Sequence, residues 1–221
     1  MIRLKAGTPK AVIFDMDGVL VDSEHHFPRE LPAILREFSI EWSDEDGRAT
    51  LGSNQPALYE YLVQRHHLRM TQDEFLARFG EAVLEHVYRK ALLVPGAQQL
   101  LADCRRRGLK TALASSSPRA WIDIVIAKFA LLQAFDAVVS GTEFRERGKP
   151  APDIFLFTAK QLGLAPSDCV VIEDSRNGVL AAKAAGMYCI CLSNPRYNYA
   201  VCPEEADMKV TELTQNDTSV P

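Results

Sequence analysis

Apolar positions alternate between two patterns along most of this chain. Short apolar runs typical of buried strands are separated by stretches in which apolar residues recur every three or four positions, the spacing of a helix face. The strand-type runs cover residues 10–15, 110–114, 136–140, 169–172 and 187–192. Gly108, Gly163 and Gly186 end the helical stretches before three of these runs. This repetition predicts an α/β fold, a parallel sheet covered by helices on both faces.

The segment after the first strand has a different texture. Residues 22–94 contain no convincing strand, and their apolar residues keep helical spacing throughout. Pro28 and Pro32 disturb the first of these helices, so its start is not defined by the pattern. Pro95-Gly96 marks the return to the α/β texture. We therefore expect two domains, a core of residues 1–21 and 95–221 and an inserted all-helical domain of residues 22–94.

Composition and charge narrow the class of protein. The chain has 221 residues, of which 47% are hydrophobic and 24% charged, with a net charge of −4. These values are typical of a globular protein, and the acidic excess argues against binding nucleic acid or an anionic membrane. No apolar run approaches the ~20 residues of a membrane helix, and the first run is too short for a signal peptide. We expect a cytoplasmic protein without nucleic-acid or membrane partners, as a monomer or a weak dimer.

The cysteines suggest no framework of disulfides. There are five, an odd number, and none has the spacing of a zinc site. Cys189 and Cys191 are two residues apart on a predicted strand, a poor geometry for bridging each other. We therefore expect reduced, buried thiols.

Acidic residues follow two of the predicted strands. Asp15 and Asp17 lie two apart, so an extended backbone directs both to one side, and Glu173 and Asp174 end a later strand. The first pair alone is also compatible with a polar turn before Gly18. Because the carboxyl ends of parallel strands share one edge, the four carboxylates would repel each other there unless a cation binds. Oxygen ligands in this number suit Mg²⁺.

A lysine and a run of serines belong to the same predicted edge. Lys149 lies between Gly148 and two prolines, and the acids give a reason to direct its charge inward rather than into solvent. Ser115 and Ser116 begin a run of three serines after the second strand, where hydroxyls and backbone N–H groups are suited to phosphate oxygens. The sequence has no GxSxG, Walker or GxGxxG pattern, which argues against a serine hydrolase and a nucleotide cofactor.

These segments together resemble the haloacid dehalogenase superfamily, and within it the β-phosphoglucomutase-like phosphatase branch. The resemblance extends over about residues 10–192. Its motifs, in order, are Asp-x-Asp-Gly-Val-Leu-Val-Asp-Ser-Glu, Ala-Ser-Ser-Ser, Gly-Lys-Pro-x-Pro-Asp and Ile-Glu-Asp-Ser-x-x-Gly. It implies a Rossmann-like core with a small helical cap inserted after the first motif, in agreement with the two textures of the chain.

The resemblance also implies roles for individual residues. Asp15 is similar to the nucleophile that takes the phosphoryl group, and Asp17 to the general acid and base. The residues expected to bind the substrate phosphate are Ser115, Ser116, Arg119 and Lys149. The implied Mg²⁺ ligands are Asp15, Asp17 through its backbone carbonyl, Asp174, and Glu173 directly or through water.

The expected function is Mg²⁺-dependent hydrolysis of a small phosphate ester, a sugar phosphate in the first place. A phosphomutase of the β-phosphoglucomutase type is the main alternative, but such mutases typically carry a cap arginine three residues after a hinge glycine. Here Gly52 is followed by Ser53, Asn54 and Gln55, which offer no cation. A phospho-accepting signalling module and a non-catalytic binding protein are weaker alternatives. His25-His26, after the first motif, indicates a solvated or substrate-contacting pair rather than a metal site.

Overall fold

The computed structural model describes residues 8–50, 55–144, 147–194, 196 and 201–213. It divides into two compact units. The core unit comprises residues 1–25 and 92–221, and the helical unit comprises residues 26–91.

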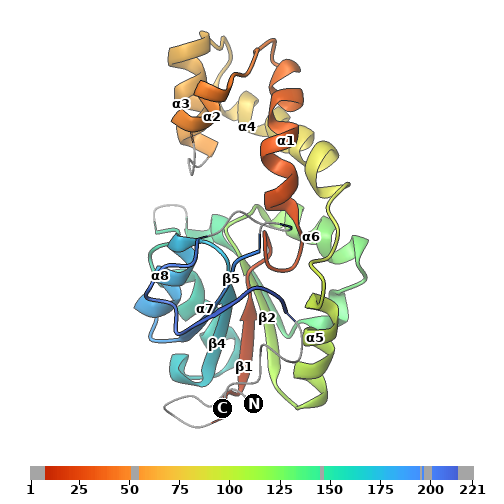
Figure 1. Ribbon diagram of the computed structural model, residues 1–221, viewed down its shortest axis with the longest axis vertical. Helices are drawn as coiled ribbons and strands as arrows, with labels where there is room; N and C mark the ends of the chain where they lie inside the picture. Colours follow the sequence, from red (N-terminus) through yellow and green to blue (C-terminus); the bar gives the residue numbers. More distant parts are fainter. Residues whose placement is uncertain (1–7, 51–54, 145–146, 195, 197–200, 214–221) are drawn as a thin grey trace. The chain divides into compact units, whose positions relative to one another are not determined.

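The core unit is built on one six-stranded sheet in the order β3-β2-β1-β4-β5-β6 (Figure 1). Every pair of neighbouring strands is parallel. The strands are β1 (Ala11–Phe14), β2 (Lys110–Ser115), β3 (Ala137–Ser140), β4 (Cys169–Glu173), β5 (Tyr188–Leu192) and β6 (Met208–Val210). The predicted parallel α/β fold is thereby confirmed, and β1, which carries the first motif, lies centrally between β2 and β4.

Helices cover both faces of this sheet. They are α5 (Ala97–Arg106), α6 (Arg119–Lys128), α7 (Asp153–Leu162) and α8 (Arg176–Ala184), and Figure 1 shows α7 and α8 on one side and α5 and α6 on the other. All four residues of β1 are buried, as expected for a central strand with helices on both faces. Ile13 packs on the side of α7 and α8, in one apolar cluster with Phe155 and Val179. This packing fixes the carboxyl edge of the sheet, where the predicted chemistry lies.

The three glycines predicted to end helices all adopt left-handed backbone angles. Gly108, Gly163 and Gly186 have φ values of 71°, 68° and 75°. A residue with a Cβ is strained in this conformation, so glycine is favoured where a helix stops and the chain turns towards a strand.

The helical unit contains no strand among its described residues. Its helices are α1 (Ser23–Arg36, which begins in the core unit), α2 (Asp44–Ala49), α3 (Gln55–His66), α4 (Gln72–Val83) and the π-helical turn η1 (Leu84–Tyr88). Helix α1 runs through both Pro28 and Pro32, so the interruption suggested by the sequence does not occur. The buried face formed by Leu31, Ile34 and Leu35 supplies the packing that outweighs the two missing backbone donors.

The cysteines correct one expectation. Cys191 of β5 forms a disulfide with Cys202, with Cα atoms 5.8 Å apart. Cys104, Cys169 and Cys189 are free and buried, as expected. The prediction of reduced thiols was wrong for this pair. The spacing of Cys189 and Cys191 on one strand argues only against a bond between those two, whereas Cys191 pairs with Cys202, which follows the strand.

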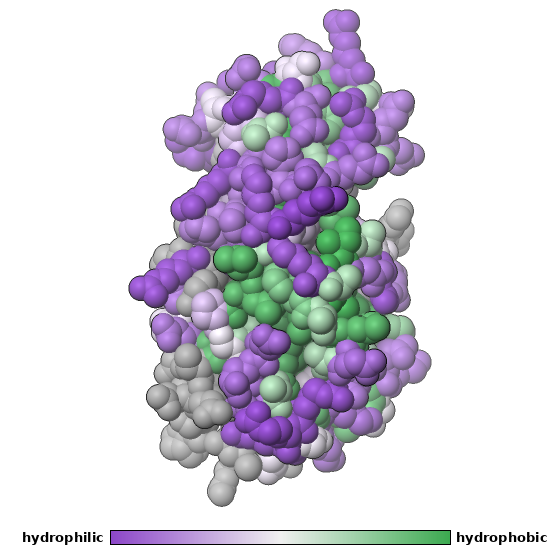
Figure 2. Space-filling view, turned by 90° about the vertical axis from the view of Figure 1, so that its right-hand side faces the viewer, coloured by the Kyte–Doolittle hydropathy of each residue, from purple (hydrophilic) through white to green (hydrophobic). Residues whose placement is uncertain are grey.

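The surface differs between the two units in Figure 2. The visible face of the helical unit is largely hydrophilic, whereas the core unit exposes a group of apolar side chains on the side that carries α5 and α6. Ile124 of α6 is 37% exposed. Within the described ranges, no helix combines the length and apolar character that crossing a membrane requires.

Candidate active site

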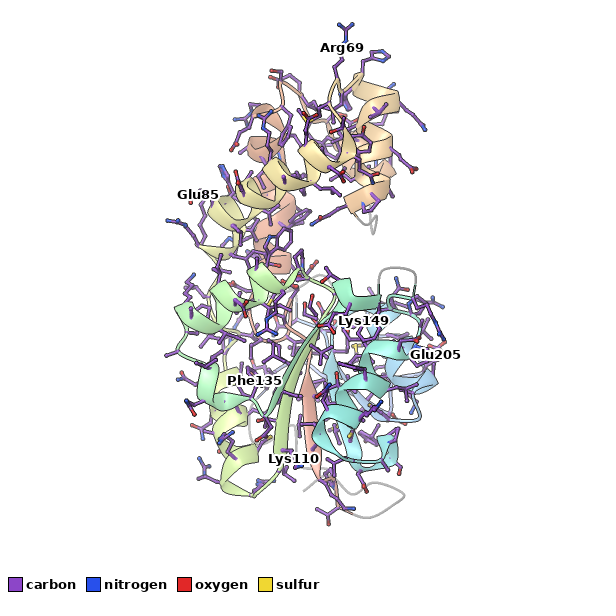
Figure 3. All side chains as sticks on the ribbon, turned by 180° about the vertical axis from the view of Figure 1, so that it is seen from behind. Arg69, Glu85, Lys110, Phe135, Lys149 and Glu205 are labelled. Atoms are coloured by element: carbon purple, nitrogen blue, oxygen red, sulfur yellow. A yellow bond between two sulfur atoms is a disulfide. The ribbon has the colours of Figure 1, made fainter. Side chains whose placement is uncertain are left out.

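The carboxyl edge of the sheet brings a lysine between two carboxylates. Lys149, which Figure 3 shows at the end of the sheet opposite Lys110, lies in the loop before α7. Its Nζ donates to Asp15 Oδ1 at 2.5 Å and to Glu173 Oε1 at 2.6 Å. Asp15 directly follows β1 and Glu173 ends β4, so three sequence-distant segments meet at one buried ammonium group.

The charge of Lys149 is stabilised by these neighbours. Burial by itself would lower the pKa of Lys149, because an ammonium loses hydration, but Asp15 and Glu173 together raise it above the ordinary value. The lysine therefore stays protonated at neutral pH. The expectation that the acids draw this loop lysine inward agrees with its 6% side-chain exposure.

The negative charge at this edge exceeds what one lysine offsets. Burial raises the pKa of Asp15 to about 8, with Glu173 and Asp17 adding to the rise and Lys149 opposing it. Burial also raises the pKa of Asp174 well above its ordinary value, and the neighbouring carboxylates of Glu173 and Asp15 raise it further. A bound cation would relieve this repulsion.

The oxygen donors at this edge suit a hard divalent cation, although the protein side chains do not supply a complete set of ligands. Within the described part of the chain, no group of three or more His, Cys, Asp or Glu side chains is arranged to hold a metal ion by itself. Mg²⁺ does not require such a group, because it commonly uses one or two carboxylates and completes its shell with water and substrate phosphate. Asp15 and Asp174, whose pKa values are raised first by burial and then by neighbouring carboxylates, supply carboxylates of this kind.

Asp17 is held by hydroxyl groups. Ser23 Oγ donates to Asp17 Oδ1 at 2.6 Å, and Ser117 Oγ donates to Oδ2 at 2.7 Å. Ser115 Oγ lies 3.4 Å from Oδ2 as well. Sequence reasoning missed Ser23 and Ser117. A signal was available, because both hydroxyls stand inside the quoted motifs, but only folding shows that they point to the same carboxylate.

Glu173 accepts hydrogen bonds on both of its carboxylate oxygens. Its Oε1 accepts from Lys149, and its Oε2 accepts from the backbone N–H groups of Asp174 and Ser175 and from Ser175 Oγ. Gly178, in the first turn of α8, leaves room for this carboxylate, since a Cβ there would lie 1.7 Å from Glu173 Oε1. Both carboxylate oxygens thus have protein donors, and the role of Glu173 as a metal ligand, directly or through water, stays a prediction.

One predicted substrate-binding residue, Arg119, pairs along its own helix, and a second, Ser116, is exposed. Arg119 Nε donates to Asp123 Oδ1 at 2.8 Å along α6, and both side chains are more than half exposed. Ser116 is exposed, unlike Ser115, whose side chain faces the buried cluster. The prediction that the cap offers no cation concerns Ser53, Asn54 and Gln55. Ser53 and Asn54 lie outside the described residues, and Gln55 begins α3.

Comparisons with known proteins show the family of the chain. Residues 9–186 match the family model of the haloacid dehalogenase-like hydrolases. The probable pseudouridine-5'-phosphatase of Drosophila melanogaster is 36% identical over 83% of this chain and 81% of its own length. The chloroplastic protein SUPPRESSOR OF QUENCHING 1 of Arabidopsis thaliana is 38% identical over 84% of this chain, which spans only 18% of that protein.

A solved structure shares the fold. CbbY from Rhodobacter sphaeroides, crystallised in complex with phosphate, superposes with a TM-score of 0.81 and 24% identity, covering 94% of this chain and 96% of that one. The parallel α/β core presents two aspartates and a buried lysine at its carboxyl edge, and the family match over residues 9–186 places the chain among the hydrolases. The chain belongs to the haloacid dehalogenase-like hydrolase family. It is a phosphoric monoester hydrolase.

Proposed function

We propose that this protein is a Mg²⁺-dependent phosphatase that hydrolyses a small organic phosphomonoester, a sugar phosphate, through an aspartyl-phosphate intermediate on Asp15. The observation that carries the proposal is the contact of Lys149 with Asp15, with Asp17 two residues away. An anionic nucleophile approaches a phosphate dianion only where positive charge offsets the repulsion, and the buried ammonium group provides part of that charge.

The first half of the reaction transfers the phosphoryl group to the protein. An oxygen of Asp15 attacks phosphorus, the bond from phosphorus to the ester oxygen breaks, and Asp17 gives its proton to the leaving alcohol. In the second half, Asp17 takes a proton from water, the water oxygen attacks phosphorus, and the bond to Asp15 breaks to release inorganic phosphate. Lys149 holds the oxygens of Asp15 and of the transferring group throughout.

The residues proposed for Mg²⁺ are the carboxylates of Asp15 and Asp174 and the backbone carbonyl of Asp17. When bound, the ion neutralises phosphate charge and orients the phosphoryl group. The raised pKa values of Asp15 and Asp174 support this assignment, because a cation between two carboxylates favours their ionised forms. Ser115, at the end of β2, is proposed to donate to a phosphate oxygen.

The proposal is tested by replacing the nucleophile. Asp15→Asn is nearly isosteric and keeps an oxygen for Lys149, but its amide does not attack phosphorus. With a panel of phosphorylated sugars and nucleosides and added Mg²⁺, we expect the wild type to release inorganic phosphate and the variant to lose about 10³-fold or more in kcat. Asp73→Asn, the same change at an exposed position of α4, serves as the matched control.

Product analysis separates hydrolysis from isomerisation. Phosphorus NMR of the wild-type reaction should show inorganic phosphate as the product. A folded Asp15→Asn protein with appreciable turnover would contradict the nucleophile assignment. Clean conversion of a sugar 1-phosphate into its 6-phosphate, without free phosphate, would contradict the phosphatase proposal and favour the mutase alternative.

A further inference from the structure

The serine-rich segment after β2 contains a hydroxyl that is directed at Asp17 rather than at the nucleophile. Ser117 Oγ donates to Asp17 Oδ2 at 2.7 Å, and on the other side of the same carboxylate Ser23 Oγ donates to Oδ1 at 2.6 Å. Two such bonds on opposite oxygens restrict the rotation of the carboxylate plane.

Ser117 is itself fixed by the neighbouring segments. Its backbone N–H donates to Ser115 Oγ at 3.0 Å, and its carbonyl accepts from Ser140 Oγ at 2.8 Å. Ser140 ends β3, is 1% exposed, and also accepts from the backbone N–H of Thr142. The position of Ser117 therefore depends on two strands, and it is not a freely rotating loop residue.

Close backbone packing reinforces this arrangement. Gly141, next to Ser140, lies so near the serine segment that a Cβ there would be 2.8 Å from Ser116 Cα and 3.2 Å from the Ser115 carbonyl oxygen. The end of β3 thus presses directly on the segment that holds Asp17. Such a contact transmits placement, because well-packed backbone has little freedom to shift.

We propose that Ser117 is a positioning residue for Asp17, and that the end of β3 acts through it. The inference rests on the proposed function, in which Asp17 protonates the leaving oxygen. Proton transfer depends steeply on placement, and a shift of about 1 Å costs up to about 10²-fold. Without the Ser117 bond, Asp17 Oδ2 loses its donor at 2.7 Å, and the carboxylate is held less firmly on that side than on the side of Ser23.

A leaving-group comparison tests this role. An alkyl phosphate such as a sugar phosphate needs a proton on its departing oxygen, whereas p-nitrophenyl phosphate releases a stable anion and needs it little. We expect Ser117→Ala to lower kcat/KM about tenfold to a hundredfold for the sugar phosphate and less than about threefold for p-nitrophenyl phosphate. The ratio kcat/KM is used because it reports the steps up to formation of the phosphoenzyme, in which Asp17 acts as the acid.

Three further variants sharpen the comparison. Ser117→Thr keeps the hydroxyl and should restore most of the sugar-phosphate rate. Ser140→Ala should show the same selectivity between the two esters with a smaller loss, since it acts through Ser117. Ser167→Ala, at an exposed serine in the 3-10 turn Pro166–Asp168 before β4, should leave both rates and the melting temperature unchanged.

Other results would contradict the role of Ser117 or the proposed function. An equal loss for both esters assigns Ser117 to binding the phosphoryl group or to folding, and an unchanged Ser117→Ala enzyme removes its role altogether. Failure of the threonine to rescue the rate also contradicts positioning by the hydroxyl. If the wild type turns over neither ester, the proposed function fails and this inference fails with it, whereas an active wild type isolates the inference.

Discussion

Glu173 illustrates how a single side chain obtains its role from partners distant in sequence. As part of an acidic pair at a strand end, it is expected to contribute to a metal site. In the folded chain its oxygens accept from Lys149, from two backbone N–H groups and from Ser175 Oγ, in a space that Gly178 leaves open. Its charge is offset by these donors, whereas burial and the neighbouring carboxylates of Glu173 and Asp15 raise the pKa of Asp174 well above its ordinary value.

Replacing Asp174 should separate activity from stability. Its pKa is raised in the folded state, so its contribution to stability is fully present below the ordinary carboxyl range and is lost as the pH rises. In the metal-free protein, Asp174→Asn removes this ionisation, and we expect its melting temperature to exceed that of the wild type by a few °C at pH 8 but not at pH 4. Phosphatase activity with Mg²⁺ should fall about 10²-fold or more.

Calorimetry with a chelator at pH 4 and pH 8 measures the melting temperatures, and an assay of phosphate release with Mg²⁺ measures the activity. Asp73→Asn is again the matched control, because that carboxylate is exposed. A variant that melts below the wild type at pH 8 would show that Asp174 stabilises the fold without a cation. Full wild-type activity in the chelator would contradict the metal assignment itself.

At the scale of elements, the helical unit contains a buried network at the start of α2. Ser43 and Asp46 form a capping box, in which Ser43 Oγ accepts from the Asp46 backbone N–H and Asp46 Oδ2 accepts from the backbone N–H and the hydroxyl of Ser43. Asp46 also accepts from Tyr61 Oη at 2.7 Å and lies 3.0 Å from His66 Nε2, both on α3. A six-residue helix is too short to persist alone, so this network joins α2 to α3.

The network makes the stability of the helical unit depend on pH. Burial alone would raise the pKa of Asp46, but the hydrogen bonds from Ser43, Tyr61 and His66 hold it below its ordinary value. The stability it contributes is therefore present above the ordinary carboxyl range and is lost as the pH falls through the lowered pKa. We expect Asp46→Asn to destabilise the protein by about 1–2 kcal/mol at pH 7 and by progressively less towards pH 2.

A second capping box in the same unit supplies the control. Thr71 and Glu74 make the corresponding contacts at the start of α4, and both are exposed; within the described ranges, their side chains hydrogen-bond to each other. Glu74→Gln should therefore have a smaller effect on urea unfolding at pH 7 than Asp46→Asn. Equal effects of the two variants would show that Asp46 acts only as a local cap.

For the whole molecule, the Cys191–Cys202 disulfide connects the sheet to the chain that follows it. Cys191 lies on β5 beside Glu173 in the register of β4, and the bridge closes a loop over a separation of 11 residues. Disulfides are more common in oxidising compartments than in the cytoplasm. The cytoplasmic location therefore stays a prediction, and the redox state of Cys191 and Cys202 in the cell would test it.

Reduction of this disulfide should destabilise the fold. Releasing a loop of this size increases the entropy of the unfolded chain, and we expect a loss of about 2–3 kcal/mol in the free energy of unfolding. Urea unfolding with and without dithiothreitol measures the difference, with mass spectrometry to confirm the free thiols. Cys202→Ser should remove the effect of the reductant, and Cys104→Ser should preserve it. An unchanged midpoint in a fully reduced wild type would contradict the prediction.

The sequence by itself determined the elements and their order. Strands such as Ala11–Phe14, the glycine stops at Gly108, Gly163 and Gly186, and the acids that follow the strands are all encoded by local patterns. These patterns are readable because the period of a strand or helix and the sterics of a left-handed turn depend on only a few neighbouring residues. The central place of β1 and the common edge of Asp15 and Glu173 then follow from parallel topology.

Only the tertiary structure decided which side chains meet at that edge. Lys149 bonds Asp15 across 134 residues, Ser117 bonds Asp17 across 100, and Arg119 turns instead to Asp123 one helical turn away. The disulfide between Cys191 and Cys202 was likewise not predictable from the pattern of strands. The physical reason is that a side-chain contact is set by distances of a few ångströms between separate elements, and these depend on how the whole sheet and its helices pack, which no local period of the sequence specifies.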